Sequence, residues 1–140
     1  MIVTDDAPAV RKIMLAAGFT NASERETVLF FNRPGSPLRL DFLRVVPETM
    51  QALLAHAVEI AYRGGHCVKV PQLRDLIAMK IFALNKGPPQ RMDKDLPDIV
   101  NLAITHHWSP EGDLKPLCDR YGTPALYDLL KTRIQERTHA

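Results

Sequence analysis

The stretch from Val70 to Leu102 constrains the fold of this chain more than any other segment. Its first half carries apolar residues around most of the circumference of a helix, as a central core helix does: Leu73, Leu76, Ile77, Met79, Ile81, Phe82 and Leu84. Asp75 and Lys80 interrupt this apolar run, and a charge on a buried helix needs a partner or a ligand. Pro71 fits the first helical turn, and the Gly-Pro-Pro sequence at 87–89 ends the helix.

A second apolar helix is predicted from about Lys94 to His106, and acidic residues crowd its start. Asp93, Asp95 and Asp98 lie there beside Lys94. Carboxylates at a helix N-terminus are stabilised by the positive end of the helix dipole. Together with the charges on the first helix, they place acids and lysines at two neighbouring helix termini. A phosphate-handling site could be built at such a place.

Composition and charge indicate a globular protein of one domain. The chain has 140 residues, of which 46% are hydrophobic and 24% charged. No apolar run approaches the roughly 20 residues that span a bilayer, and the N-terminus lacks the features of a signal peptide, so a cytoplasmic location is expected. A net charge of +2 gives no support for a dedicated nucleic-acid binder. Cys67 and Cys118 lie outside any CxxC motif, which argues against zinc or a redox pair.

The remaining segments predict an α+β fold. A small, mainly antiparallel sheet is expected in residues 1–70 and a helical region in residues 71–140, together forming one compact domain. Strands are predicted at 1–4, 27–32, 38–45, 58–62 and 66–70, and further helices begin near residues 5, 47, 109 and 123. In the strand LRLDFLRV, Leu40 and Phe42 point to one face and Asp41 to the other.

Three segments of the chain carry a resemblance to a known family: LRLDFL at 38–43, PQLRDLIAMK at 71–80 and KDLPDI at 94–99. Together they resemble the AbiEii-type nucleotidyltransferase proteins. That family occurs among the toxins of type IV toxin–antitoxin systems. The resemblance covers roughly residues 1–105 and implies a polymerase-β-like nucleotidyltransferase fold. It implies that Asp41 is the third catalytic carboxylate and a metal ligand, and that Lys80 and Lys94 contact phosphates. The matching helical positions are Pro71, Asp75, Ala78 and Lys80, then Lys94, Asp95 and Asp98, with the aspartates expected to support the site.

The chain departs from the family in one respect: the glycine turn and the two aspartates one residue apart have no match. The family pattern places them before a segment like MIVTDDAPAV, so the chain is expected to be shortened at its N-terminus. Asp5 and Asp6 are adjacent and would face opposite sides of a strand, so they are expected to cap a helix instead. Transfer of a nucleoside monophosphate from an NTP to an RNA or protein acceptor uses two Mg²⁺ ions, which Asp41 alone would hold poorly. We therefore expect a nucleotidyltransferase-family protein that is catalytically incomplete as written.

The sequence leaves other roles open for these residues. Asp41 is either a metal or base residue or a strand carboxylate paired with Arg39 or Arg44. Lys80 either contacts phosphate or an ion-pair partner within the site, or extends from the core helix to water. Lys94 and the two aspartates that follow it are either part of the site or a helix start with local salt bridges.

At the level of the whole protein, the alternative is a non-catalytic interaction or nucleotide-binding module, with an NTP, RNA or a cognate antitoxin as partner. A weaker alternative is a nucleic-acid-binding domain that uses Arg33, Arg39, Arg44, Lys80 and Arg91. A homodimer is also expected. The strand TVLFFN (27–32), which has no charge to block pairing, or the strand MIVT (1–4) would otherwise leave an unpaired sheet edge.

Overall fold

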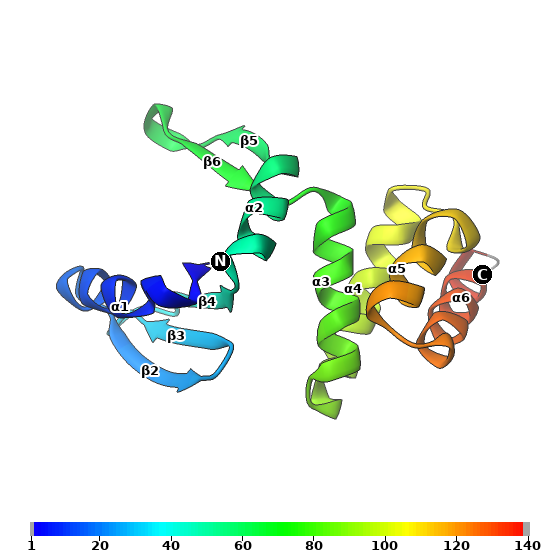
Figure 1. The fold of residues 1–140 in the computed structure, drawn as a ribbon, viewed down its shortest axis with the longest axis horizontal. Helices are drawn as coiled ribbons and strands as arrows, with labels where there is room; N and C mark the ends of the chain where they lie inside the picture. The colour runs from blue at the N-terminus through cyan, green and yellow to red at the C-terminus, as the bar shows by residue number, and fades with distance from the viewer. Residues whose placement is uncertain (1, 139–140) are drawn as a thin grey trace. The chain divides into compact units, whose positions relative to one another are not determined.

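The computed structural model describes the backbone of residues 2–138 and the side chains of these residues except 2–4 and 63. The chain divides into two compact units, Met1–Val70 and Pro71–Ala140. The division falls where the strand pattern of the sequence gives way to the helical pattern, and Figure 1 shows the elements of each unit. The units are described separately below.

The first unit is built on a four-stranded mixed sheet. Its strands are β1 (Ile2–Val3), β2 (Thr20–Arg25), β3 (Val28–Asn32) and β4 (Arg39–Val45), in the spatial order β1-β4-β3-β2. The pairs β2–β3 and β3–β4 are antiparallel, whereas β1 runs parallel to β4. The expected small, mainly antiparallel sheet is therefore confirmed.

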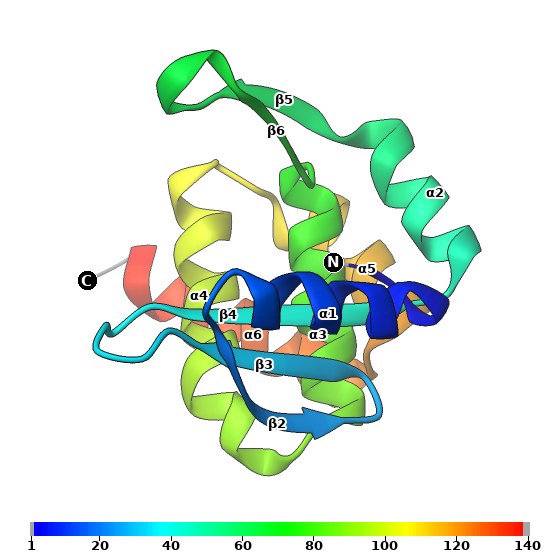
Figure 2. The ribbon, with the colours of Figure 1, turned by 90° about the vertical axis from the view of Figure 1, so that its left-hand side faces the viewer.

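Helix α1 (Ala7–Ala16) covers one face of this sheet, as Figure 2 shows. Met14 packs there against Leu29 and Phe31 of β3, which are fully buried, and Leu40 and Phe42 of β4 pack around them. The alternation expected for β4 is correct, because Asp41 is exposed on the opposite face of the strand.

The start of α1 differs from the expected aspartate cap. A 3-10 turn, Thr4–Asp6, precedes the helix, and Asp6 at the N-cap position already has helical backbone angles (φ −81°, ψ −8°). A capping side chain normally belongs to a residue with extended backbone angles, from which its oxygen reaches back to the first turn. The Asp6 side chain accordingly makes no capping hydrogen bond.

The first unit continues with α2 (Pro47–His56) and a two-stranded antiparallel hairpin, β5 (Val58–Ala61) and β6 (Cys67–Val70). Gly64 and Gly65 turn this hairpin with φ angles of 78° and 76°, which glycine adopts without steric cost. The hairpin expected from the Arg-Gly-Gly sequence is confirmed.

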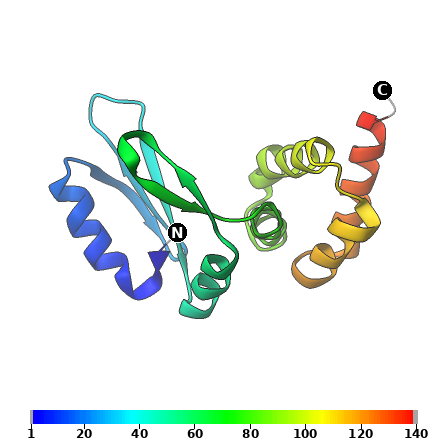
Figure 3. The ribbon, with the colours of Figure 1, turned by 90° about the horizontal axis from the view of Figure 1, so that it is seen from above.

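The second unit is entirely helical within its described residues. It contains α3 (Leu73–Lys86), α4 (Met92–Thr105), α5 (Lys115–Tyr121) and α6 (Pro124–Thr138), with a 3-10 turn at Pro89–Arg91 and a π-helical turn at Pro110–Leu114. Figure 3 looks nearly along α3 and shows α4 beside it. The four helices and the π-helical turn bury one core, made of Ile77, Ile81, Ile99, Val100, Ala103, Leu114, Leu117, Cys118, Leu126, Leu130 and Ile134. The α+β class with a helical C-terminal half is thus confirmed, and the polymerase-β-like fold remains a hypothesis.

One strand changes an expectation that rests on sheet edges. The sequence does not predict β2, because its residues TNASER are all exposed and show no apolar alternation. Its presence puts β3 between two neighbours, so the expected unpaired edge at TVLFFN is wrong. β1 does lie at an edge, but it is only two residues long. The edge expected at the MIVT strand is therefore present, the one expected at TVLFFN is not, and the homodimer stays a prediction.

Two helix starts also differ from the sequence pattern. Helix α3 begins at Leu73, so Pro71 precedes it and does not lie in its first turn. Helix α4 begins at Met92, before the expected start, and continues through Pro97. In the part of the chain that the structure describes, no helix combines the length and the apolar composition needed to cross a membrane.

Candidate functional site

The candidate site is a cluster of charged side chains between α3 and α4. Lys80, in the second half of α3, donates from Nζ to Asp95 Oδ1 at 2.9 Å and to Asp98 Oδ2 at 2.7 Å. Asp95 and Asp98 are three residues apart on α4 and therefore lie on the same face of that helix. A single ammonium group thus connects the two helices through two carboxylates.

Arg91 completes the cluster from the turn before α4. Its Nη1 donates to Asp95 Oδ2 at 3.1 Å, so each oxygen of this carboxylate accepts one charged hydrogen bond. Only 8% of the Asp95 side chain is exposed, compared with 18% for Lys80, 40% for Arg91 and 45% for Asp98. Two cations and two anions balance in formal charge. A buried carboxylate needs such compensation, because its desolvation is costly.

The environment of Lys80 shifts its pKa. Burial alone lowers the pKa of this amine, but the hydrogen bonds to Asp98 and Asp95 and the charges of the two carboxylates outweigh burial. The pKa of Lys80 therefore lies above its ordinary value of 10.5. The ammonium form is retained across the physiological range. It uses two of its three N–H donors on the aspartates, so one donor is left for a further acceptor.

Asp41 lies in the first unit and has a different environment. Arg39, two residues away on β4, donates to it from Nε at 2.7 Å and from Nη2 at 3.2 Å, which is a two-pronged pair. Both side chains are about half exposed, and the Arg39 guanidinium also lies 4.5 Å from the ring centroid of Phe30 on β3. Of the two roles that the sequence leaves open for Asp41, the structure contains the pair with Arg39.

The other predicted site residues lie in the helical unit. Asp75 is in the first turn of α3, where the helix dipole favours a carboxylate, and it is half-buried. Lys94 is exposed on α4, next to the buried Asp95. The structure thus brings Lys80, Asp95 and Asp98 into direct contact. The local salt bridges expected at the start of this helix are present between Arg91 and Asp95.

The described residues do not fit a magnesium site. Mg²⁺ needs several oxygen ligands, usually carboxylates with free oxygens. Asp95 and Asp98 accept from Lys80, and Asp41 accepts from Arg39. Among the described side chains, no group of three or more His, Cys, Asp or Glu residues could hold a metal ion.

Sequence reasoning missed the role of Arg91 in this cluster. From the sequence, Arg91 is expected only as a nucleic-acid contact, yet its position four residues before Asp95 is the spacing of a helical ion pair. The partners of Lys80 were also not identifiable, since 15 and 18 residues separate it from the two aspartates.

Neither a protein-family model nor a curated protein sequence matches this chain. The resemblance to the AbiEii-type proteins therefore remains a hypothesis that rests on the residues quoted for it.

Proposed function

We propose that this chain is a nucleotidyltransferase-like protein that keeps a phosphate-contacting lysine but does not transfer nucleotides by itself. The observation that carries the proposal is the bridge from Lys80 to Asp95 and Asp98. These are the residues for which the AbiEii-type resemblance implies a role in the site, and they meet although they come from different helices. The nucleotidyltransferase-like fold itself is proposed by analogy with the AbiEii-type proteins.

The lack of transfer follows from how the carboxylates are used. Nucleotidyl transfer needs an in-line displacement at phosphorus, with metal ions that stabilise the attacking and leaving oxygens. In this chain the candidate ligands are paired with cations: Asp41 with Arg39, and Asp95 with Lys80 and Arg91. Because each carboxylate would have to give up a charged hydrogen bond to bind a metal, metal binding is disfavoured.

Phosphate contact without transfer is consistent with the state of Lys80. Its ammonium has one donor left and is 18% exposed, so a phosphate oxygen can approach it. Lys94 lies on the exposed side of the same helix as the two aspartates and can add a second positive charge. The expected ligand is an NTP, held weakly because the aspartates offset the charge of Lys80.

The transfer assay uses the full chain with labelled NTPs, Mg²⁺ or Mn²⁺, and RNA and protein acceptors. We expect acceptors to stay unlabelled above a reaction without protein. Robust incorporation that Asp41→Ala abolishes would contradict the proposal. Asp119→Ala is the matched control, because Asp119 is an exposed aspartate that pairs only with Lys115 among the interactions of the described residues.

Nucleotide binding is measured separately by calorimetry. We expect Lys80→Met to weaken NTP binding at least about fivefold, as the loss of one close charge does. Lys86→Met removes an exposed lysine from the last turn of the same helix and should leave the affinity unchanged. Equal weakening by both variants would mean that only the overall charge attracts the nucleotide.

An interaction module is the second candidate function, and the β5–β6 hairpin favours it. Val58, Ile60 and Tyr62 alternate along one face of this hairpin, with Val68 directly opposite Ile60. Their exposed fractions are 49%, 49%, 66% and 42% in that order. An isolated two-stranded hairpin is only marginally stable, so such a face is a candidate for covering by a second copy of the chain.

Light scattering of the full chain tests this second candidate. A dimer mass that becomes a monomer mass with Ile60→Lys would support it, and Lys69→Gln on the opposite face of the hairpin should not change the mass. A monomer mass for the unaltered chain at micromolar concentration would contradict both this contact and the predicted homodimer.

A further inference from the structure

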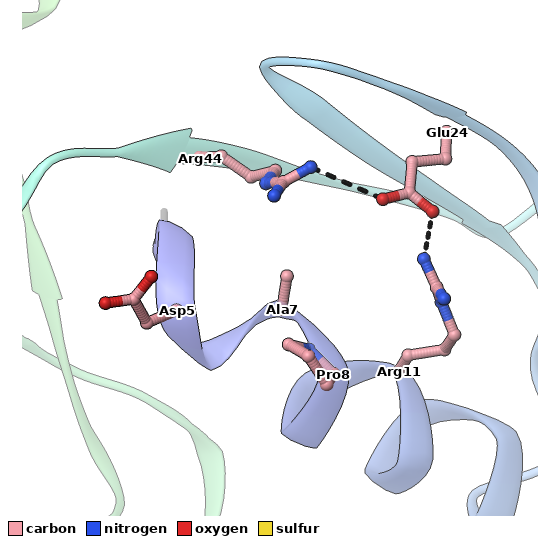
Figure 4. Close-up of a pocket in the computed structure, with 6 residues that line it drawn as sticks. All are labelled: Asp5, Ala7, Pro8, Arg11, Glu24 and Arg44. Atoms are coloured by element: carbon pink, nitrogen blue, oxygen red, sulfur yellow. Dashed lines mark hydrogen bonds and ion pairs between the residues drawn. The ribbon is translucent and has the colours of Figure 1, made fainter.

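A small open cavity lies in the first unit where the start of α1 faces the ends of β2 and β4. It has a volume of about 370 Å³ and is lined by Asp5, Ala7, Pro8, Arg11, Glu24 and Arg44. Figure 4 shows the two guanidinium groups on either side of the Glu24 carboxylate. None of these residues belongs to the Lys80 cluster, which lies wholly in the other unit.

Two arginines share one carboxylate in this cavity. Arg11 donates from Nη2 to Glu24 Oε2, and Arg44 donates from Nη1 to Glu24 Oε1 at 3.3 Å. The Arg44 contact is long, because charged hydrogen bonds are usually about 2.7–2.9 Å. Two positive charges facing one negative charge leave one unit of positive charge uncompensated by this carboxylate.

The Nε–H groups of both arginines are a second, independent observation. Each is buried and has no hydrogen-bond partner among the described residues. Such donors are rare in native proteins and often indicate an ion or a water molecule that completes the site. A guanidinium offers five N–H donors, in a planar fork that fits two oxygens of one anion. Glu24 satisfies neither fork fully.

Two further charges act on the cavity. The N-terminus of α1, a helix of 10 residues, points its partial positive charge at this region. Asp5 also lines the cavity and opposes an anion, but its carboxylate points away from the guanidinium groups (Figure 4). The side chain of Arg44 is 21% exposed and that of Arg11 is 38% exposed, so both remain reachable from solvent.

We propose that this cavity is an oxyanion site that takes a phosphate group between Arg11 and Arg44. Glu24 is the internal carboxylate that holds the two guanidinium groups when the anion is absent. A phosphate dianion has more acceptor oxygens and more charge than a carboxylate, so it can accept N–H groups from both arginines at once. The proposal goes beyond the function proposed above, because it needs neither a metal nor any residue of the helical unit.

The test is a titration of the full chain with inorganic phosphate, followed by amide NMR signals of Ala7, Arg11 and Arg44. We expect saturable shifts at these positions in the millimolar range. Arg44→Gln should weaken binding at least about tenfold, as the loss of one two-pronged contact does. Lys12→Gln is the matched control, because Lys12 is an exposed basic residue on α1 that does not line the cavity, and it should leave the affinity unchanged.

Glu24→Gln separates a binding site from a structural clamp. It removes the competing negative charge, so phosphate binding should become tighter by about fivefold. If the three side chains only fasten α1 to the sheet, Glu24→Gln will leave phosphate binding undetectable, and that result would overturn the proposal. This variant keeps the test decisive even if Arg44→Gln disturbs folding.

The source of the phosphate group is distinguished by further ligands. A nucleoside monophosphate that binds much more tightly than inorganic phosphate, while its nucleoside alone does not bind, would indicate a nucleotide. Equal affinities for the monophosphate and for inorganic phosphate would indicate a site for the free anion. Shifts spread evenly over the surface, and equally weakened by Lys12→Gln, would refute a defined site.

Discussion

Replacing Lys80 by methionine tests whether the cluster between α3 and α4 holds the helical unit together. Methionine keeps most of the apolar stem of lysine and removes only the ammonium group. The change removes the donor to Asp95 Oδ1 and the donor to Asp98 Oδ2. Asp95 is then left with Arg91 as its only charged partner among the interactions that the structure contains.

The expected cost follows from the burial of the two aspartates. Removing one partner of a fully buried ion pair costs about 3–5 kcal/mol. Here Asp95 is 8% exposed but keeps Arg91, and Asp98 is 45% exposed and can be hydrated. We therefore expect a loss of about 2–3 kcal/mol in the free energy of unfolding. Such a loss is a large fraction of the stability of a small folded unit.

Urea denaturation followed by the fluorescence of Trp108 measures this loss. Trp108 is the single tryptophan of the chain, and it packs against the core of the helical unit. With a denaturant slope of about 1–3 kcal/mol/M, a loss of about 2–3 kcal/mol should lower the urea midpoint by roughly 0.7–3 M. Lys86→Met is the control, since Lys86 is exposed on the same helix, and surface changes usually stay within about 0.5 kcal/mol.

A double-mutant cycle identifies the partner. The double variant Asp95→Asn with Lys80→Met should lose less unfolding free energy than the sum of the two single changes, by about 1–2 kcal/mol. The reason is that the double variant leaves no buried charge without a partner. The reasoning would be refuted if Lys80→Met behaved like Lys86→Met. Additivity of the two changes at Lys80 and Asp95 would also refute it.

Three further predictions concern ionisation, thiol access and backbone space. The pKa of Lys80 in the folded protein is raised above 10.5. The difference in unfolding free energy between the native chain and Lys80→Met should therefore be constant at neutral pH and disappear as the pH rises through this folded-state pKa. Urea midpoints measured at several pH values check this. The pKa of the buried Cys118 thiol is raised to about 11, mainly by burial. A thiol reagent should therefore modify Cys118 at least about a hundredfold more slowly than the exposed Cys67. Peptide mass analysis measures the order of modification, and the reverse order would contradict this prediction. Gly87→Ala should destabilise the helical unit by about 1–3 kcal/mol, because the added Cβ would lie 2.4 Å from the carbonyl oxygen of Ala83. An unchanged thermal unfolding midpoint would contradict this.

The sequence alone determined the elements whose signals are local. The apolar pattern and the Gly-Pro-Pro sequence at 87–89 predict two consecutive helices, and α3 and α4 are present on either side of that elbow. Gly64 and Gly65 predict the β5–β6 hairpin, since positive φ angles at a tight turn favour glycine. Such features depend on residues a few positions apart, so a single sequence contains them.

Tertiary structure decided which side chains meet. β2 forms because it pairs with β3, not because TNASER has a strand pattern, and its position turned β3 from an edge into an interior strand. Lys80 met Asp95 and Asp98 rather than a carboxylate of its own helix, and Glu24 met both Arg11 and Arg44 across 13 and 20 residues. The physical reason is that strand pairing and ion pairs between elements depend on distances set by packing, which residue spacing along the chain does not specify.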